Sequence, residues 1–533
     1  MVAALGVCAL LLSPGSARAA SFVVNSLSDG TPNGCQTTPD GCTLREAITD
    51  ANGNSSAVTD QISSSVTGTI ALTDALPTIM TSTTITGPSA EELQVIGNTI
   101  SPADGMFGVN VPLGQSVRIE RIKIASARAF GFSGGGVSMT GAGALVLDNV
   151  WFFDNSATSG GAIGYSAGTT TVTNSLFSNN RADPATGEGF GGAILGSGLG
   201  HLNLINSTLT NNSAREFGGA IHTGTMATLT INSSTITENT ANTDNDLIGD
   251  GGGVVRNSSA GALLIANTIL TGNTVGANGG PNTQCSGSFT SQGFNLRSTA
   301  DPGCTGFIAS DIVNPNPLLG MLGPNGGLTQ TIPLLTGSPA INAGNPVAVG
   351  GAFPACPATD QRGRPRGAGA GNCDIGALER LGHTTTTTVA CTPTSLNLGA
   401  GSTTCTVTVA DTSSPPTNPM GNVSFTSNGT GTFSGGGSCL LLGNAGSPGC
   451  QVTYTPTAAG SGSHQITASY PGDVDHDPSQ GATQLAVIGP GGIGPGTQPN
   501  RLRKAIKKCK KKFPKGPKRK KCIKRAKRRA QAT

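Results

Sequence analysis

A motif repeated five times between residues 145 and 273 constrains the fold of this chain more than any other feature of its sequence. The first position of the motif holds Asn149, Asn174, Asn206, Ser233 and Asn267, at intervals of 25, 32, 27 and 34 residues. Three residues later each copy has an apolar residue, in order Phe152, Phe177, Leu209, Ile236 and Leu270. Six residues later each copy has an asparagine, in order Asn155, Asn180, Asn212, Asn239 and Asn273. The same side chains therefore return at fixed places although the spacing between copies varies.

The residues before each motif alternate in hydrophobicity, which is typical of a strand with one buried face. The position four residues before the motif holds Leu145, Thr170, Leu202, Leu229 and Leu263, and the position two before it holds Leu147, Val172, Leu204, Ile231 and Ile265. A repeat of this length cannot bury such a face alone, so the copies must stack. The sequence therefore predicts an all-β fold, a right-handed parallel β-helix whose coils lie about 4.8 Å apart.

Further elements set the expected extent of this solenoid at residues 55–310. A glycine-rich element follows four of the copies, as GGAI ending at Ile163, Ile194 and Ile221 and as GGVV ending at Val255. An earlier coil matches the template with Val117, Ile119, Arg121, Ile124 and Ala127, and TSTTITG around Ile85 is a further candidate. The varying intervals predict that insertions lie in loops between coils.

The recurring asparagines admit two interpretations. In a stack of coils, Asn tolerates the left-handed bend between strands, and its amide can donate to the amide oxygen of the next coil. Each such bond contributes only about 0.5–1.5 kcal/mol, but a ladder of them also fixes the register. The alternative is a polar ligand site copied in every coil. We favour the structural ladder.

Twelve of the 13 cysteines fall into neighbouring pairs, which predicts local disulfides in an oxidising compartment. The expected partners are Cys35 and Cys42, Cys285 and Cys304, Cys356 and Cys373, Cys391 and Cys405, Cys439 and Cys450, and Cys509 and Cys522. In the Ig-like region described below, such bonds would join neighbouring strands. A structural zinc site is the alternative, but the sequence has no CxxC-type clusters with supporting histidines.

The N-terminal segment, residues 1–19, has the pattern of an export signal. It has an apolar run over residues 2–12, a Pro14-Gly15 break and the small residues Ala17 and Ala19. The run is too short to span a bilayer as a helix, and no later transmembrane segment is expected. The predicted location is therefore secreted or at the cell surface, in the cell envelope.

Three passages resemble families of bacterial surface proteins. GCTLREAITDAN, residues 41–52, resembles the CSLREA signature with Thr43 in place of Ser, and the repeats resemble those of polymorphic outer-membrane proteins. Residues 317–346, with TDQRGRPR and residues 373–379, resemble a choice-of-anchor Q domain. The resemblance implies a secreted or surface-exposed β-helix of the pectin-lyase-like kind, without a defined reaction. It assigns residues 20–54 to an N-terminal cap and residues 311–380 to the choice-of-anchor Q-like segment.

The expected cap contains a short helix. Leu44, Ala47, Ile48 and Ala51 recur at helical spacing. An amphipathic helix there would cover the open end of the solenoid, where unpaired backbone otherwise invites edge-to-edge association.

Residues 384–488 follow a different pattern. Alternating runs such as TCTVTVAD, NVSFTSN, CQVTYTP and HQITASYPGD are separated by turn signals. They resemble a bacterial Ig-like domain, a β-sandwich of about 100 residues. Glycine and proline in residues 489–500 predict a flexible linker to the last segment, residues 501–533.

The last segment is strongly basic. It holds 18 lysines and arginines and no acid, whereas the first 500 residues hold the remaining 14 basic residues and all 28 acidic ones. Apolar residues at helical spacing predict two short helices stapled by Cys509 and Cys522, and a solvated disordered run is the alternative. Either form should bind anionic envelope polymers or extracellular polyanions, more weakly as salt rises. The residues expected to bind are Lys504, Lys507, Lys508, Lys510, Lys511, Lys512, Lys518, Arg519, Lys520, Lys521, Lys524 and Arg525.

An enzymatic function is the main alternative, because parallel β-helices also include lyases and hydrolases of acidic polysaccharides. The tripeptide Arg121-Ile122-Lys123 also occurs in polygalacturonases, but no pair of aspartates and no histidine motif precedes it here. His201 and His222 are single histidines for which we expect surface or loop positions.

No cofactor is expected, although two acidic stretches could bind Ca²⁺. Residues 244–253 could do so from a loop, with a solvated insertion as the preferred interpretation. Residues 473–484 begin like an EF-hand, but Pro478 and Gln484 stand where Gly and a bidentate Glu are required. The sequence therefore predicts an exported, non-catalytic, adhesin-like or structural protein, with a possible carbohydrate or protein ligand on the β-helix.

Overall fold

The computed structural model describes most of the chain, which divides into two compact units, Met1–Arg380 and Leu381–Thr533. The described residues are 18–30, 34–35, 41–54, 58–97, 105–129, 134–183, 189–246, 248–281, 283–347, 349–367, 372–414, 416–443, 446–489, 498–513 and 516–531. Residues 1–17 of the predicted signal, including Cys8, and residues 490–497 of the predicted linker lie outside them.

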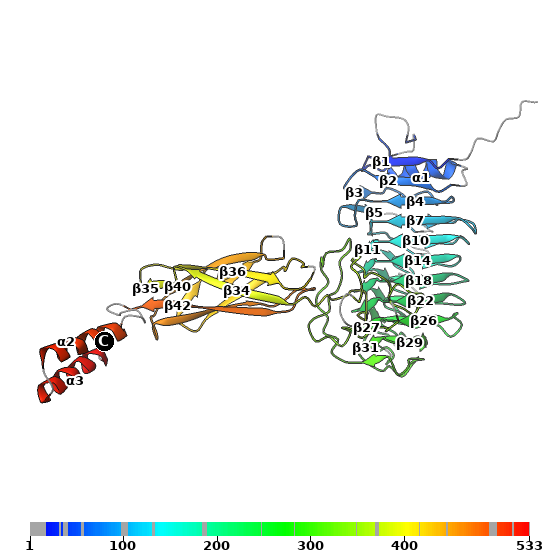
Figure 1. The fold of residues 1–533 in the computed structure, drawn as a ribbon. Helices are drawn as coiled ribbons and strands as arrows, with labels where there is room; N and C mark the ends of the chain where they lie inside the picture. Colours follow the sequence, from blue (N-terminus) through cyan, green and yellow to red (C-terminus); the bar gives the residue numbers. More distant parts are fainter. Residues whose placement is uncertain are drawn as a thin grey trace, which may run out of the picture. The chain divides into compact units, whose positions relative to one another are not determined.

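The strands of the first unit form four sheets of parallel strands. Sheet A contains β1 (Ser21–Val24), β2 (Asp60–Ser64), β4 (Thr83–Thr86), β7 (Ser116–Glu120), β10 (Ala144–Asp148), β14 (Thr169–Thr173), β18 (His201–Ile205), β22 (Thr228–Asn232), β26 (Leu263–Ala266) and β30 (Thr290–Ser291). Sheet B contains β3 (Gly68–Ala71), β5 (Leu93–Ile96), β8 (Lys123–Ala125), β11 (Trp151–Phe153), β15 (Leu176–Ser178), β19 (Thr208–Thr210), β23 (Thr235–Thr237), β27 (Ile269–Thr271), β31 (Leu296–Arg297) and β33 (Ile312–Val313). Figure 1 shows the strands of sheet A stacked from β1 to β26.

The other two sheets of this unit are smaller. Sheet C contains β6 (Phe107–Val109), β9 (Val137–Met139), β13 (Ile163–Tyr165), β17 (Ile194–Gly196), β21 (Ile221–Thr223), β25 (Val254–Arg256), β29 (Cys285–Ser288) and β32 (Cys304–Thr305). Sheet D contains β12 (Ser156–Ala157), β16 (Arg181–Ala182), β20 (Ser213–Ala214), β24 (Thr240–Ala241) and β28 (Thr274–Val275). Successive strands of one sheet come from successive coils, which is consistent with the predicted parallel β-helix.

Strand pairing stacks the repeated positions directly over one another. Leu145 pairs with Thr170, and the series continues through the next three copies to Leu263. The apolar position three residues into the motif stacks in the same way from Phe152 to Leu270. The apolar side chains of both columns belong to one continuous core that extends through the stack of coils.

The glycine-rich element of the fourth copy is shifted by one residue from its predicted position. The partner of Ile221 in the neighbouring strand is Val254, not Val255. The element is therefore GGGV, and Gly253 stands where the other copies have alanine. A Cβ atom on Gly253 would lie 2.4 Å from the carbonyl oxygen of Gln284, so this coil excludes the alanine of the other copies.

The parallel sheets also extend beyond residues 55–310. Strand β1 lies within the predicted N-terminal cap and pairs with β2, and β33 pairs with β31 after residue 310. The cap segment is therefore continuous with the stack, because Phe22 and Val24 of β1 add to the same apolar core.

The expected N-terminal helix is α1 (Leu44–Gly53). It begins with a capping box, in which the Thr43 side chain accepts the Glu46 N–H and the Glu46 side chain accepts the Thr43 N–H. The four residues of its predicted apolar face are buried in the core of the first coils. The helix lies beside β1 and β2 at the N-terminal end of the stack (Figure 1).

The second unit contains two further sheets around one core. The first has the order β34 (Thr385–Thr392), β36 (Thr403–Asp411), β40 (Gly449–Pro456) and β38 (Gly431–Phe433). The second has the order β35 (Ser395–Asn397), β42 (Ser479–Ile488), β41 (Ser463–Tyr470), β37 (Asn422–Ser427) and β39 (Ser438–Leu440), and the 3₁₀ helix η1 (Ser434–Gly437) precedes β39. Neighbouring strands are antiparallel, except for β35 and β42, which are parallel. Val407 and Tyr454 of one sheet and Ile466 and Leu485 of the other lie in the shared core.

Two helices end the described chain, α2 (Gln498–Lys512) and α3 (Pro517–Gln531). Helix α2 begins three residues before the predicted tail. Pro499 is compatible with this start, because the first turn of a helix does not need the N–H that proline lacks.

All six cysteine pairs expected from the sequence form disulfides within the described part of the chain. The bonds join Cys35 to Cys42, Cys285 to Cys304, Cys356 to Cys373, Cys391 to Cys405, Cys439 to Cys450 and Cys509 to Cys522. Each bond therefore closes a short local loop, as neighbouring cysteines predict.

The two disulfides of residues 384–488 differ in what they join. Cys391 and Cys405 face each other across the paired strands β34 and β36, as we expected. Cys439 and Cys450 also join neighbouring strands, β39 and β40, which contact each other but belong to different sheets. The bond from Cys439 to Cys450 therefore ties the two sheets of the second unit together.

Candidate functional site

The asparagines six residues into the motif form a continuous ladder of side-chain amides. Each Nδ2 donates to the Oδ1 of the next coil, at 3.0 Å from Asn155 to Asn180, 2.8 Å to Asn212, 2.9 Å to Asn239 and 2.9 Å to Asn273. Gln284 continues the series, since its Oε1 accepts from Asn273 at 3.0 Å. All five asparagines are buried.

Backbone groups use the remaining hydrogen-bonding capacity of this ladder. The Oδ1 of Asn212 also accepts the Asn180 N–H at 3.0 Å, and its Nδ2 also donates to the carbonyl of Phe177 at 3.0 Å. The same pair of backbone contacts recurs at Asn180 and Asn239. Because an amide oxygen has two lone pairs and an amide nitrogen two protons, these side chains have no donor or acceptor left for a ligand.

The first column of the motif forms the expected left-handed bends but not the expected amide ladder. Its residues Asn149, Asn174, Asn206, Ser233 and Asn267 all have left-handed backbone, with φ between 46° and 54°. They form the bends between sheets A and B, where asparagine is the side chain that tolerates positive φ best. They do not form a second continuous amide ladder. Asn206 donates weakly to Asn174 at 3.4 Å, and Asn267 donates instead to Asn232.

Two further columns were missed by the sequence analysis. The residue just before each ladder asparagine is also left-handed, in order Asp154, Asn179, Asn211, Glu238 and Gly272. A hydroxyl column follows the first bend, in which Ser175, Ser207, Ser234 and Thr268 each accept a backbone N–H from the preceding coil. The recurring Ser or Thr directly after the first column was the signal in the sequence.

Residues 314–380 lie against sheet B and the first asparagine column. The Asn206 Nδ2 donates to the Thr359 carbonyl at 2.7 Å, and its Oδ1 accepts from Arg366 at 3.0 Å. The Thr208 hydroxyl donates to Gln361 at 2.6 Å. Apolar residues of this segment also pack on sheet B, where Leu334, Ala340 and Ile375 join Ile269 and Leu296. The segment therefore covers one face of the central coils, where a repeated ligand site would need to be accessible.

Charged residues inside this cover pair with one another. Arg366 is fully buried and lies 3.3 Å from Glu379, and the buried Arg362 side chain lies 2.9 Å from Asp360. Burial, reinforced by the nearby Glu379, raises the pKa of Asp374. Residues of TDQRGRPR thus contribute to the packing of the cover, and the side chains of Arg362 and Arg366 are withdrawn from solvent.

The tripeptide Arg121-Ile122-Lys123, which also occurs in polygalacturonases, has structural contacts in this protein. Arg121 has left-handed backbone with φ 60°, as the first column requires. The Lys123 Nζ lies 3.8 Å from the centre of the Trp151 ring and 4.3 Å from that of Phe153. Burial against these rings lowers the pKa of Lys123. These contacts are a cation–π arrangement. The ion pairs found among the described residues do not include Lys123.

The two histidines of the first unit lie on strands. His201 is in β18, half-buried, with its ring nitrogens near Thr228 and Asn203. His222 is in β21 and only 6% exposed, so the expected surface or loop position is wrong for this residue. Its ring stacks on the Phe190 ring, with the two ring centres 4.9 Å apart, and Phe190 thereby helps to bury it. Burial lowers the pKa of His222 to about 4.

The two acidic stretches differ in how their carboxylates are used. Asp244 and Asp246 lie close to Glu216, and Asp244 pairs with Arg215 at 2.9 Å. The Asp473 carboxylate accepts hydrogen bonds from five protein donors: the N–H groups of Met420, Asp475 and His476, the Tyr470 hydroxyl and the His476 ring. Such a saturated carboxylate supports the turn interpretation of residues 473–484 over an EF-hand-like site.

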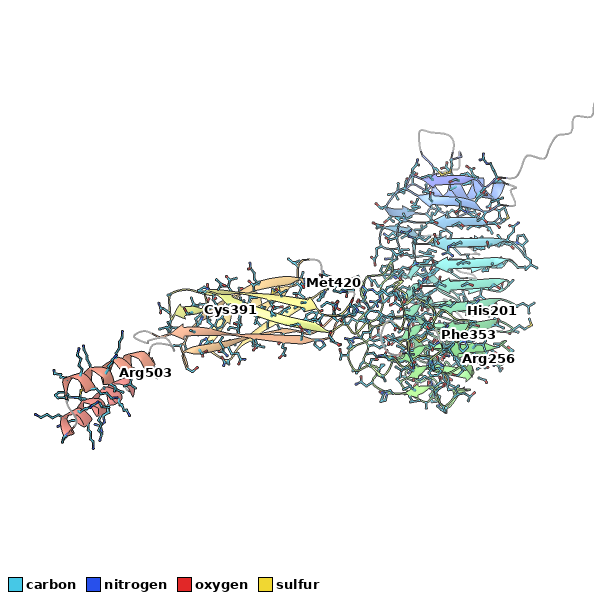
Figure 2. The ribbon with its side chains drawn as sticks, in the orientation of Figure 1. His201, Arg256, Phe353, Cys391, Met420 and Arg503 are labelled. Atoms are coloured by element: carbon cyan, nitrogen blue, oxygen red, sulfur yellow. A yellow bond between two sulfur atoms is a disulfide. The ribbon has the colours of Figure 1, made fainter. Side chains whose placement is uncertain are left out.

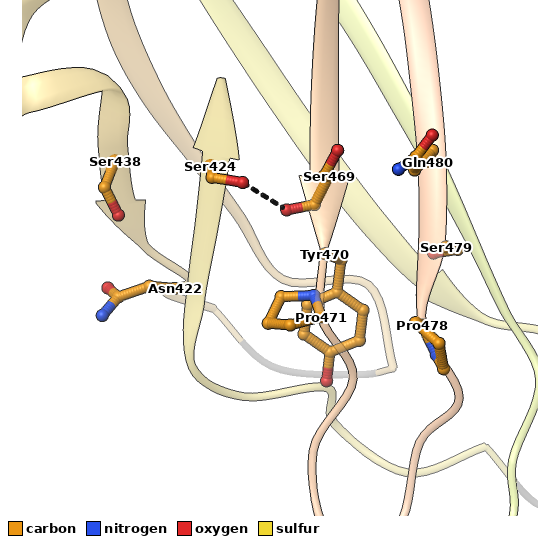
Figure 3. Close-up of a pocket in the computed structure, with 9 residues that line it drawn as sticks. All are labelled: Asn422, Ser424, Ser438, Ser469, Tyr470, Pro471, Pro478, Ser479 and Gln480. Atoms are coloured by element: carbon orange, nitrogen blue, oxygen red, sulfur yellow. Dashed lines mark hydrogen bonds between the residues drawn. The ribbon is translucent and has the colours of Figure 1, made fainter. Parts of the chain in front are cut away.

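A hollow of about 670 Å³ lies on the second unit near this turn. Its lining consists of serines, prolines and amide side chains around Tyr470, in or next to β37, β39, β41 and β42. None of the nine lining residues is Asp, Glu, His, Lys or Arg, the side chains that usually act as acids or bases near neutral pH. Figure 3 shows Tyr470 and Pro471 among the lining residues, and the Ser424 hydroxyl directed at the Ser469 carbonyl. This hollow offers hydroxyls and a shallow apolar floor, without the two carboxylates of a glycosidase.

The tail presents the densest positive charge in the described chain. Helices α2 and α3 contact each other along their length, and a disulfide joins Cys509 to Cys522. The apolar residues Leu502, Ile506, Phe513 and Ile523 are partly buried. Figure 2 shows the long side chains of both helices, Arg503 among them, extending outward from the hairpin.

Exposed cations of both helices line a hollow on the hairpin. The hollow has a volume of about 1320 Å³, and Cys509, Phe513 and Cys522 form part of its lining. Eight cations line it: Lys508, Lys511, Lys512, Lys518, Lys521, Lys524, Arg525 and Arg528. Of the other predicted binding residues, Lys504, Lys507, Lys510 and Lys520 are exposed and Arg519 is half-buried.

Comparisons with protein-family models, with curated proteins and with solved structures found no match for this chain. Its architecture and contacts are therefore the observations on which a function can be argued. Among the described residues, we find no helix with the length and apolar character needed to cross a membrane.

Proposed function

We propose that this chain is an exported, non-catalytic surface protein that is held on anionic polymers by its cationic tail. In this proposal the stacked coils form a rigid scaffold, and residues 384–488 form an Ig-like module that separates the scaffold from the tail along the chain. The resemblance to CSLREA, polymorphic outer-membrane and choice-of-anchor Q proteins favours the same class, a secreted or cell-surface β-helix protein.

One observation carries the proposal: the cations of α2 and α3 surround a hollow instead of being spread over an extended chain. Eight lysines and arginines line this hollow, and no acid occurs in residues 501–533 to neutralise them. Adjacent like charges repel one another, so an anionic polymer that lies among them gains attraction and relieves that repulsion. The disulfide from Cys509 to Cys522 keeps the two helices together against the same repulsion.

The first unit supports a scaffold in preference to an enzyme. The inner ladder asparagines Asn180, Asn212 and Asn239 have no free side-chain hydrogen-bonding group, and residues 314–380 cover the adjoining face of sheet B. Lys123 of the polygalacturonase-like tripeptide lies against two aromatic rings. These contacts give the conspicuous polar residues of the repeat structural partners.

Charge-neutral and charge-conserving variants of the tail test this proposal. We expect K508Q/K511Q/K512Q to bind duplex DNA, used as a polyanion of defined charge, more weakly than the wild type. The slope of log K against log salt should fall in magnitude by about 1 for each cation that contacts a phosphate. K508R/K511R/K512R keeps the charge and should keep the wild-type slope. Equal affinities and slopes for the wild type and the glutamine variant would show that these lysines do not bind polyanions.

A further inference from the structure

Three separate parts of the second unit bring a polar cluster together, independently of the tail. His383 lies two residues before β34, Asp411 is the last residue of β36, and His476 lies in the turn between β41 and β42. The backbone holds the two histidines beside each other, because the His383 N–H donates to the Asp475 carbonyl at 2.8 Å and the Asp477 N–H donates to the His383 carbonyl at 2.8 Å. Their positions are therefore set by the fold and not by flexible side chains alone.

Four polar atoms meet at this point. The Oδ2 of Asp411 lies 2.7 Å from His383 Nδ1 and 3.4 Å from His476 Nε2. The Thr417 Oγ1 lies 2.9 Å from His476 Nε2, 3.2 Å from His383 Nδ1 and 3.3 Å from Asp411 Oδ2. Metal–ligand bonds of about 2.0–2.1 Å place tetrahedral ligands about 3.3–3.4 Å apart. Four of the five distances are within about half an ångström of that value, and the fifth needs only a small separation of His383 from Asp411.

Burial and orientation suit a bound cation. The side chains of His383, Asp411 and His476 are 13%, 0% and 2% exposed. The Nδ1 of His476 lies 2.7 Å from Asp473 Oδ1, so in the neutral ring Nδ1 donates its proton to Asp473 and Nε2 presents a lone pair to the cluster. A carboxylate behind a ligating histidine is the usual orienting partner in protein metal sites.

The kind of ligand atoms selects the class of ion. Ca²⁺ and Mg²⁺ prefer oxygen ligands, whereas two imidazoles with one carboxylate suit zinc and its neighbours among the first-row transition metals. The five donors that saturate Asp473 give it an orienting role behind His476. This arrangement differs from a calcium loop, in which the first aspartate binds the ion directly.

We propose that His383, Asp411 and His476 bind one divalent transition-metal ion of the zinc type, with a hydroxyl or water oxygen at the fourth corner where Thr417 Oγ1 stands. Binding displaces the proton that His383 Nδ1 shares with Asp411, and this proton leaves to solvent. The ion would tie the start of the second unit to the turns after β36 and before β42. Without an ion, the same groups form a hydrogen-bonded clamp between these segments.

Zinc titration of the full chain without an affinity tag distinguishes the two states. After dialysis against a chelator, the wild type should bind one Zn²⁺ per chain in calorimetry. His383→Ala and His476→Ala should each weaken this binding by more than the about 10–100-fold that loss of an orienting partner typically costs. His464→Ala is the matched control, because this buried imidazole of the same unit contacts Tyr454, outside the cluster. It should bind zinc like the wild type.

A wild-type measurement covers the case in which a variant does not fold. Zn²⁺ should shift the imidazole NMR signals of His383 and His476 and leave those of His464 in place, and Co²⁺ should give the absorption of a tetrahedral site. The proposal is overturned if the wild type binds no zinc, or if zinc binds without moving the His383 and His476 signals. Either outcome assigns the cluster to the hydrogen-bonded clamp and leaves the proposal for the tail untouched.

Discussion

The side-chain nitrogen of Asn180 lies 2.8 Å from the side-chain oxygen of Asn212 in the next coil, and both residues are shielded from solvent. The same oxygen accepts the backbone N–H of Asn180 at 3.0 Å. Each coil thereby fixes its neighbour through a side chain and a main chain at once. Because the motif repeats this contact, a shift of register would leave several buried amides without partners.

Removal of one ladder residue should be costly. Asn212→Ala leaves the Asn180 N–H and Nδ2 and the Asn239 Oδ1 with fewer partners in a buried site. We expect a loss of at least about 2 kcal/mol in the free energy of unfolding, measured by denaturant titration. Asn203→Ala on the same coil is the control, because the one side-chain hydrogen bond of this half-exposed residue within the described part of the chain is with His201, and it should cost about 0.5 kcal/mol or less. Equal losses for the two variants would contradict the role of the ladder.

Gly253 provides a test of the register of the fourth glycine-rich element. The other copies have a buried alanine at this position, so similarity among the copies predicts that Gly253→Ala does not destabilise the protein. The structure predicts the opposite, since the new Cβ would lie 2.4 Å from the Gln284 carbonyl oxygen and 3.0 Å from Asn273 Nδ2. We expect a destabilisation of about 1–3 kcal/mol, as for other overpacked sites. A thermal midpoint at or above that of the wild type would instead support the alignment in which GGVV, ending at Val255, is the repeated element.

The periodic features of this chain were accessible from its sequence, and the non-periodic ones were not. Columns such as Phe152 to Leu270 repeat a side-chain type at a fixed place, so their stacking in one core could be predicted. The run GGGVV permits two alignments that differ by one residue, and a contact with Gln284 decides between them. The second left-handed column was hidden because it shares a backbone angle and not a residue type.

Contacts between distant residues explain what the sequence analysis missed at the candidate sites. Asn206 and Thr359 are 153 residues apart, and no pattern in either segment indicates that one covers the other. The residues His383, Asp411 and His476 likewise come from three separate segments, each of which has an ordinary sequence. The hairpin of the tail was one of two interpretations, because helical spacing alone does not show whether the apolar faces of α2 and α3 pack together.

Burial of His222 should make the first unit sensitive to acid. The native pKa of about 4 lies below the value of about 6.5 in an unfolded chain, so the unfolded state binds the proton first. The contribution of this residue is therefore complete above about pH 6.5 and is lost as the pH falls toward 4, by about 3 kcal/mol in all. His222→Leu introduces the residue type of Leu195, which occupies the paired position in the neighbouring strand. In this variant the thermal midpoint should fall less between pH 7 and pH 4.5 than in the wild type. An unchanged pH dependence in this variant would show that other groups control the acid response.

Retention on an anionic envelope tests most directly the claim that the tail holds this protein in place. Purified full-length chain, a chain ending at residue 497 and the variant K508Q/K511Q/K512Q are added to isolated bacterial envelopes and washed with rising salt. We predict that the full-length chain stays bound at low salt and is released as salt rises, that the truncated chain does not bind, and that the variant is released at lower salt than the wild type. Equal retention of the full-length and truncated chains at every salt concentration would contradict the account.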